Sequence, residues 1–394
     1  MTDVIERYLM LGLRLGRHVD GLVDAYYGPP GIADAVAAES QVNPGDLAAE
    51  ADGLAQSVAG AADLDPQRRA WLGDQIRGLR TYAGVLAGEA ISYADEVEQC
   101  YGVRPVRGSQ DVYREAHEQL EELLPGTGSL LERLEGWRSE HAVAADGLVP
   151  ALTAVSTILR VRTSRLVGLP AGEEVAIEPV TDEPWWAFNY YLGGLRSRVV
   201  INTDQPTTAA DIVKLAAHEV YPGHHTEHAL KEQLLIRDGG RLEEGLQLVP
   251  TPQTVISEGI AETGLGVLLD DELTHELEAA LEEQGYEADL DEAIAIGEAR
   301  RPLGSIGVDA ALIVHEEGGS EDDARAYVER WGLRTPEQAA RSVRFVTDPT
   351  WRAYVITYSA GEDLCEAYVG GDPARFRKLL TEQVRVADLL AASA

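Results

Sequence analysis

The stretch HEVYPGHH, residues 218–225, is the most informative part of this 394-residue chain, because it joins metal-binding side chains to a helix-breaking dipeptide. Four of the nine histidines, at positions 218, 224, 225 and 228, fall within it or just after it. A second acidic segment, SEGIAE at residues 257–262, follows about forty residues later. Clustered imidazoles and carboxylates of this kind are typical of a metal site with its own general base.

A hydrolytic zinc site uses three protein ligands and leaves a fourth position for water. In the common His-Glu-x-x-His pattern, the two histidines lie four residues apart on one helical face, with the glutamate beside the metal. Here Glu219 follows His218 as required, but the next histidines are His224 and His225. On a regular helix, His225 would lie about 10 Å from His218 and His224 would point roughly 120° away from it. A continuous helix therefore cannot build the site.

The dipeptide Pro222-Gly223 supplies the break that this geometry needs. Proline removes a backbone donor and clashes with the preceding turn, and glycine accepts the torsions that result. We therefore expect His218 and His224 to bind the metal, with His225 as the alternative second ligand. A cluster of histidines beside Pro-Gly is otherwise typical of a surface helix–turn–helix.

The second acidic segment supplies the third ligand. Glu258 opens an apolar, helix-like run over residues 258–269, and we expect it to complete the ligand set for one zinc ion per chain. Glu262 lies one turn further along the same face and is expected to hydrogen-bond a ligand. Glu219 is the expected general base that removes a proton from water.

A rival pattern overlaps the same residues. HHTEH, residues 224–228, fits the inverted zincin pattern His-x-x-Glu-His, which needs a continuous helix from residue 224. It leaves His218 and Glu219 without a role, so we favour the first interpretation.

The motif His-Glu-x-x-Pro-Gly-His-His with a downstream Glu-Gly-x-Ala segment resembles the signature of the domain of unknown function 885 family, regarded as metal-dependent peptidases related to the gluzincins. Residues 190–203 (YYLGGLRSRVVINT) and the block of Arg344, Pro349, Tyr358 and Gly361 resemble further parts of that family. The resemblance covers roughly residues 180–365. It implies a largely helical peptidase with a small sheet edging the active-site groove, and short peptides as substrates.

The chain departs from the family pattern around the expected substrate site. Ile260 and Thr263 stand where the family has an aromatic pair, Ala311 where it has an aspartate, and Tyr354 where it has a glutamine. The metal-binding residues match, whereas the walls of the substrate site differ.

Three further residues have candidate roles. Tyr358 has the hydroxyl group needed to donate a hydrogen bond to a developing oxyanion, or it is a half-buried core tyrosine. Arg344 is a candidate for binding a substrate carboxylate, or a structural ion-pair partner. Asn202 ends a short strand over residues 199–202, which as an edge strand would pair with an extended peptide; Asn202-Thr203 equally fits a turn.

The amino-acid composition limits the kinds of partner that the protein is expected to bind. Sixty-seven acidic against 33 basic residues give a net charge of −34, which argues against binding of nucleic acids or anionic membranes. Cys100 and Cys365 fit no metal or redox spacing, so we expect free thiols in a cytoplasmic protein. The first 21 residues lack the apolar core of a signal peptide, and no apolar run approaches a membrane span.

Helical periodicity dominates and predicts a mainly α fold. Val4, Tyr8, Leu11 and Leu15 mark a first amphipathic helix. Further helices are predicted over residues 46–59, 66–86, 111–124, 129–143, 147–167, 273–283, 288–300, 320–331, 335–347 and 373–391, and strands around 174–177 and 196–201. We expect a helical part (1–170) and a metal-binding catalytic part (171–394), packed as one body with the site in the groove between them.

The expected function is zinc-dependent hydrolysis, most readily of short peptides. Two alternatives remain open at this point: hydrolysis of a non-peptide amide or ester, and a binding or regulatory protein that keeps the metal without turnover.

Overall fold

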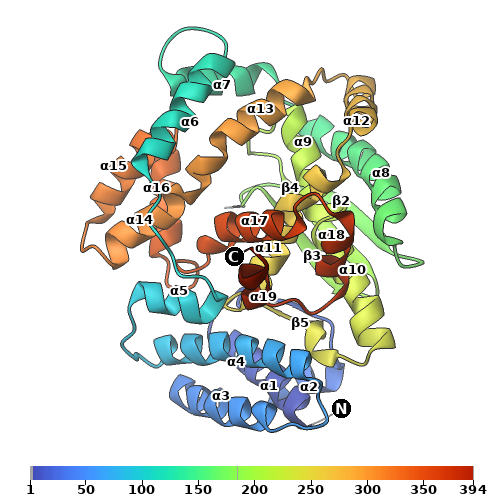
Figure 1. The fold of residues 1–394 in the computed structure, drawn as a ribbon, viewed down its shortest axis with the longest axis vertical. Helices are drawn as coiled ribbons and strands as arrows, with labels where there is room; N and C mark the ends of the chain where they lie inside the picture. The colour runs from blue at the N-terminus through green and yellow to red at the C-terminus, as the bar shows by residue number, and fades with distance from the viewer. Residues whose placement is uncertain (1–2, 184, 394) are drawn as a thin grey trace.

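The computed structural model describes residues 3–183 and 185–393, and within them the chain is mainly helical with two small sheets. Figure 1 shows the helices of residues 3–86 at one end of the long axis and those of residues 110–140 at the opposite end. In this described part, no helix is both long and apolar enough to span a membrane.

The first helices build a core of their own. They are α1 (Asp3–Gly16), α2 (Pro30–Ala38), α3 (Pro44–Ala59) and α4 (Pro66–Leu86). Val4, Tyr8, Leu11 and Leu15 are all buried, which confirms the predicted apolar face of α1. Strand β1 (Val23–Tyr26) follows α1 and pairs antiparallel with β5 (Leu246–Leu248), which ties this end of the molecule to the later part of the chain.

The next helices pack mostly against later elements. They are α5 (Tyr93–Tyr101), α6 (Gln110–Leu123), α7 (Leu130–Glu140) and α8 (Leu148–Val167). Leu152 and Leu159 of α8 share a core with Val199 and Ala216, which lie close to the candidate site in sequence. The division near residue 170 stays a prediction, and this apolar core extends across it.

The three-stranded sheet has the order β2-β4-β3, from β2 (Glu174–Val180), β3 (Ala187–Gly193) and β4 (Arg196–Asn202). β4 pairs with β2 in parallel and with β3 antiparallel. The prediction that residues 199–202 form a free edge strand is therefore wrong. The apolar run Val199–Ile201 is fully buried, as expected for a central strand with both sides paired.

The motif segment forms two short helices separated by a break. α9 (Ala209–Leu215) continues as a π-helical turn (Ala216–Val220), and three residues separate that turn from α10 (His224–Lys231). A further π-helical segment (Glu232–Asp238) and a short 3₁₀ helix (Leu242–Gly245) lead to β5. α11 (Pro252–Leu268) then passes beside the motif, and it begins six residues before the predicted start at Glu258.

In the described part of the chain, eight C-terminal helices follow α11, and α17, α18 and α19 pack against it. They are α12 (Asp271–Glu283), α13 (Leu290–Arg300), α14 (Ile306–His315), α15 (Glu321–Trp331), α16 (Pro336–Thr347), α17 (Ile356–Val369), α18 (Pro373–Thr381) and α19 (Val386–Ser393). The single helix predicted over residues 373–391 is wrong, because the chain is extended at Glu382. There the side chain of Gln383 is buried and hydrogen-bonds Glu243, a tertiary contact that helical periodicity does not reveal.

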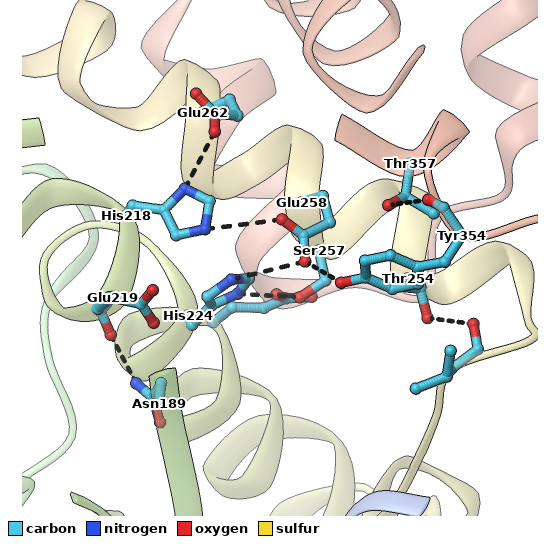
Figure 2. Close-up of polar contacts among 12 residues, drawn as sticks. Asn189, His218, Glu219, His224, Thr254, Ser257, Glu258, Glu262, Tyr354 and Thr357 are labelled. Carbon is cyan, nitrogen blue, oxygen red and sulfur yellow. Dashed lines mark hydrogen bonds and ion pairs between the residues drawn. The ribbon is translucent and has the colours of Figure 1, made fainter. Parts of the chain in front are cut away.

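Helices α11 and α17 cross at two glycines. A Cβ built on Gly259 would lie 2.3 Å from the backbone oxygen of Gly361, and one on Gly361 would lie 2.5 Å from the backbone oxygen of Val255. Neither position has room for a side chain. This crossing brings the chain just before α17, including Tyr354, next to Glu258 (Figure 2).

Candidate metal centre

The break in the motif lies where the sequence predicts it. Tyr221 is extended, the Tyr221–Pro222 peptide is cis, and Gly223 is the residue before the first turn of α10. The Gly223 amide donates to the Ala217 carbonyl oxygen at 2.8 Å, so α10 starts directly against the π-helical turn. The imidazole rings of His218 and His224 consequently meet edge-to-face, with centroids 4.7 Å apart.

Gly223 is required at this contact. A Cβ there would lie 1.9 Å from the carbonyl oxygen of His218 and 2.5 Å from that of Ala217. No real Cβ atom approaches backbone so closely, so only glycine lets the two short helices meet. The Pro-Gly dipeptide thus both ends the first helix and sets the separation of the two histidines.

Three of the predicted ligands come together from two segments of the chain. Ligand atoms of His218, His224 and Glu258 all lie within 4.8 Å of one another. His218 Nε2 is 3.6 Å from Glu258 Oε2, and His224 Nε2 is 4.0 Å from Glu258 Oε1 (Figure 2). In the described part of the chain, these three residues form the group of histidine, cysteine or acidic side chains that lie close enough together to hold one ion.

His218 is oriented by a carboxylate behind it. Its Nδ1 lies 3.4 Å from Glu262 Oε1, which leaves Nε2 directed at Glu258, as Figure 2 shows. Glu262 also pairs with Lys214 at 2.9 Å. Burial alone would lower the pKa of His218, but the hydrogen bond and charge of Glu262 outweigh it and raise that pKa to about 9. This carboxylate behind the imidazole is the role predicted for Glu262.

His224 is oriented by a buried relay that the sequence did not reveal. Ser257 Oγ donates to Glu227 Oε2 at 2.5 Å, so it accepts from His224 Nδ1 at 3.3 Å. Glu227 in turn accepts from Lys231 at 2.7 Å and from Gln253 at 2.9 Å. With the proton on Nδ1, Nε2 of His224 keeps its lone pair for a metal.

The charge state of His224 agrees with that assignment. Burial, together with the positive charges of His218 and His228, lowers its pKa well below the usual value, so the ring is neutral near pH 7. A neutral imidazole is the form that binds zinc.

Glu258 lies between both histidines and a tyrosine. Tyr354 donates its hydroxyl hydrogen to Glu258 Oε1 at 2.7 Å, whereas the buried Oε2 atom has no hydrogen-bond partner. Burial raises the pKa of Glu258 to about 7, against the opposing charge of His218 and the hydrogen bond from Tyr354. An unpaired acceptor that is costly to bury is what a bound cation would satisfy.

Glu219 is not one of the three side chains that lie close enough together to hold an ion. Its backbone oxygen accepts from Asn189 of β3 at 2.5 Å, which fixes the π-helical turn against the sheet (Figure 2). Glu219 is a buried residue, 6% exposed, and within the described residues no hydrogen-bond donor reaches its carboxylate. Burial raises the pKa of Glu219, and the charge of His218 opposes that shift.

The donor set fits a zinc ion. Bonds of about 2.0–2.2 Å in tetrahedral geometry place ligand atoms about 3.3–3.6 Å apart. Here one ligand atom from each of the three residues lies within 4.8 Å of the others, and the two histidines are 3.6 and 4.0 Å from separate oxygens of Glu258. Two imidazoles and one carboxylate leave one position open, as in hydrolytic sites. The unpaired Oε2 atom of Glu258 and the neutral ring of His224 each have a lone pair available to bind the ion.

His225 is not available as the alternative ligand, so that prediction is corrected. Its side chain is fully buried, Nε2 pairs with Glu173 at 2.9 Å, and Nδ1 hydrogen-bonds Ser197 at 2.8 Å. Tyr221 donates to the same Glu173 oxygen at 2.5 Å. His225 therefore anchors the start of α10 to the sheet, and both of its nitrogens are occupied.

In the rival pattern at residues 224–228, the base would be Glu227, and its carboxylate is already occupied. The carboxylate of Glu227 is held by Lys231, Gln253 and Ser257, and the charge of Lys231 helps to lower its pKa although burial opposes this. In the described part of the chain, His228 is not among the side chains that lie close enough together to hold one ion.

The predicted substrate-binding residues have mixed outcomes. Asn202 is buried, and its amide donates to the carbonyl oxygens of Glu183 and Trp185, so it holds a loop as the turn alternative expected. Arg344 is exposed on α16, and no described contact joins its side chain to the centre. Tyr358 packs edge-on against Tyr354 at 5.5 Å and is 43% exposed, which places it at the solvent side of Glu258.

Comparison with family models and with curated proteins finds no match for this chain. Among solved structures, it is similar to a "putative lipoprotein" from Colwellia psychrerythraea, with a TM-score of 0.52 and 13% identity over 92% of this chain and 69% of that one. A "putative lipoprotein of unknown function" from Shewanella oneidensis gives a TM-score of 0.48 and 12% identity, over 91% and 75% of the two chains. At such low identity, the first likeness shows a shared fold alone.

Proposed function

We propose that this protein is a zinc-dependent hydrolase in which His218, His224 and Glu258 hold one zinc ion. The observation that carries the proposal is the convergence of these three side chains beside the unpaired carboxylate of Glu219. The segments that supply them are more than thirty residues apart, and each ligand is oriented by a separate polar partner.

Zinc, when bound, supplies Lewis-acid chemistry that polarises a carbonyl group and lowers the pKa of water towards 7. Glu219 accepts the proton of the attacking water and passes it to the leaving group. The raised pKa of Glu219 suits both proton transfers, because a base with a pKa nearer the working pH also returns its proton readily. Tyr358 is the candidate donor to the oxyanion.

Short peptides are the substrates that we propose, on the strength of the motif resemblance and the mainly helical fold. Strand β3, helix α11 and the chain just before α17 contribute residues next to the centre, and we propose that the substrate binds beside them. A cytoplasmic location also stays a proposal, and the two buried, unpaired thiols of Cys100 and Cys365 support it.

Zinc content tests the ligand set directly. Protein purified without added metal should hold about one zinc per chain by mass spectrometry, and His224→Ala and Glu258→Ala should each lose it. His275→Ala is the matched control, because His275 is an exposed histidine of α12 that contacts only its own helix. Wild-type protein that stays free of zinc after zinc is supplied would refute the proposal.

Turnover is tested separately with Glu219→Gln. This variant should keep zinc but lose the hydrolysis of a peptide library by about 10²-fold or more, the usual contribution of a general base. Hydrolysis of esters but not of peptides would change the substrate class. Zinc binding without any hydrolysis would favour a binding or regulatory protein.

A further inference from the structure

A narrow cavity lies between the first helices and the segment that leads into α11. Tyr8 of α1 and Trp71 of α4 line it on one side, and Glu244, Thr251 and Gln253 are among the residues that line it on the other. Every residue of the lining is buried. The cavity therefore sits at the joint between the N-terminal helices and the later part of the chain, and none of its lining residues is one of the three proposed zinc ligands.

Glu244 is a carboxylate without a partner in this cavity. It is 1% exposed, and neither of its carboxylate oxygens has a hydrogen-bond partner among the described residues. The amide of Gln383, the neighbouring donor, donates instead to Glu243 at 3.2 Å. Burial of an acceptor pair without donors is costly, and the cost is greater when the group is charged.

Gln253 adds a second unpaired oxygen to the same lining. Its Nε2 atom donates to Glu227 Oε1 at 2.9 Å, and its backbone amide donates to Gln75 Oε1 at 3.2 Å. The carboxylate of Glu227 accepts only, so the amide group of Gln253 cannot turn round. Its Oε1 atom is thereby left buried and without a hydrogen bond. The remaining unpaired atom of the lining, Trp71 Nε1, is a donor and takes no part in binding a cation.

The charges around the cavity leave one negative charge without a counter-charge. Glu243 pairs with Arg68 at 2.6 Å, and Glu227 pairs with Lys231 at 2.7 Å. Within the described residues, no ion pair reaches Glu244. One bound positive charge would therefore neutralise the cavity, whereas a divalent ion would leave an excess charge that is costly to bury.

A proton is the other way to remove this charge. Burial raises the pKa of Glu244 to about 7, and the charge of Lys231 and the nearby amide of Gln383 oppose that shift. Above this pKa the carboxylate is ionised and needs a cation. The geometry of the lining decides which cation fits.

The cavity is too narrow for a water molecule. A hydrogen-bonded water oxygen lies about 2.7–2.8 Å from its oxygen partners, whereas oxygen ligands approach a dehydrated calcium ion to about 2.3–2.6 Å. Sodium has nearly the radius of calcium and carries a single charge, so it needs less room than water. Potassium is about as large as a water molecule, and magnesium usually keeps several of its waters.

We propose that this cavity binds one dehydrated sodium ion through the carboxylate of Glu244 and the side-chain oxygen of Gln253. Carboxylate and amide oxygens are suitable ligands for such a hard cation. The ion would join the N-terminal helices α1 and α4 to the segment that leads into α11. This site goes beyond the proposed hydrolase, and it depends on neither zinc nor turnover.

The test uses metal-free, full-length protein at pH 8, where Glu244 is mostly ionised. Equilibrium dialysis with radioactive sodium should find about one bound ion per chain. With sodium about tenfold above its dissociation constant, Tm should be about 1–3 °C higher in sodium chloride than in choline chloride of equal ionic strength. Potassium chloride should give the same Tm as choline chloride, because potassium does not fit.

Glu244→Gln keeps the shape of the side chain and removes its charge. This variant should stay folded by circular dichroism, bind no sodium and give one Tm in all three salts. Glu283→Gln is the matched control, because it removes the same charge from an exposed position on α12 and should keep the preference for sodium.

Three results would overturn the proposal. One is wild-type protein that binds no sodium and unfolds at the same temperature in all three salts, a result that requires no variant. Another is a preference for sodium that survives in Glu244→Gln, which would place the ion elsewhere. The last is stabilisation by calcium at equal ionic strength that exceeds that by sodium, which would contradict the charge count.

Discussion

Replacing Gly223 with alanine tests how the break in the motif builds the metal centre. A Cβ at this position would lie 1.9 Å from the carbonyl oxygen of His218, whereas even tight contacts of real Cβ atoms are at least 3.0 Å. The obstacle is backbone, so no side-chain rotation relieves it. The π-helical turn and α10 must therefore separate by about 1 Å, the difference between those two distances.

That movement carries His224 away from His218 and Glu258. Zinc sites tolerate deviations of only about 0.2 Å in ligand distances. Loss of second-shell support alone costs about 10–100-fold in metal affinity, so we expect Gly223→Ala to lose at least as much. The overpacked contact should also lower the free energy of unfolding by about 1–3 kcal/mol.

Zinc affinity is measured by competition with a chromophoric chelator, and stability by thermal unfolding of metal-free protein. Gly266→Ala is the matched control, because Gly266 lies on α11 with nothing within 4 Å of a built Cβ. That change should leave zinc affinity unaltered and stabilise the helix by up to about 1 kcal/mol. A folded Gly223→Ala protein with wild-type zinc affinity would refute the reasoning.

Three further predictions concern the groups around the ligands. Ser257→Ala removes the acceptor that holds the proton on His224 Nδ1, so zinc affinity should fall about 10–100-fold in the chelator assay; an unchanged affinity would show that the relay does not orient the ring. Tyr354→Phe removes the donor to Glu258, and should weaken zinc binding about tenfold while circular dichroism stays the same; a loss of helix would instead indicate a structural role. In the metal-free protein, His218 is protonated below a pKa of about 9 and Glu258 below a pKa of about 7, so zinc must displace these protons. The apparent affinity for zinc should therefore rise from pH 6 to 9 and then level off. A flat profile would contradict the ligand assignment.

The parts of this protein that follow from local rules were predicted from the sequence. The amphipathic face of α1 and the boundaries of α4 depend on three- and four-residue spacing and on caps such as Asp65, which accepts from the Arg68 amide. The break at Pro222-Gly223 is local as well, because it depends on the torsions of two adjacent residues. The motif therefore indicated His218, His224 and Glu219 before any fold was known.

The sequence alone left His224 and His225 as alternatives, and only tertiary contacts separate them. His225 turns to Glu173, more than fifty residues earlier, while His224 turns to Ser257 and Glu258, more than thirty residues later. Periodicity records which face a residue occupies, but it carries no information about which distant segment covers that face.

The same limit explains the residues that sequence reasoning missed. Tyr354 reaches the centre through the crossing of α11 with α17. The relay from Lys231 through Glu227 to Ser257 joins two helices inside the protein. The sequence indicated which groups are candidate metal ligands and where the helix breaks, because both depend on neighbouring residues. Only the tertiary structure decided how those groups are oriented and charged, because hydrogen bonds and burial depend on segments that are far apart in the chain.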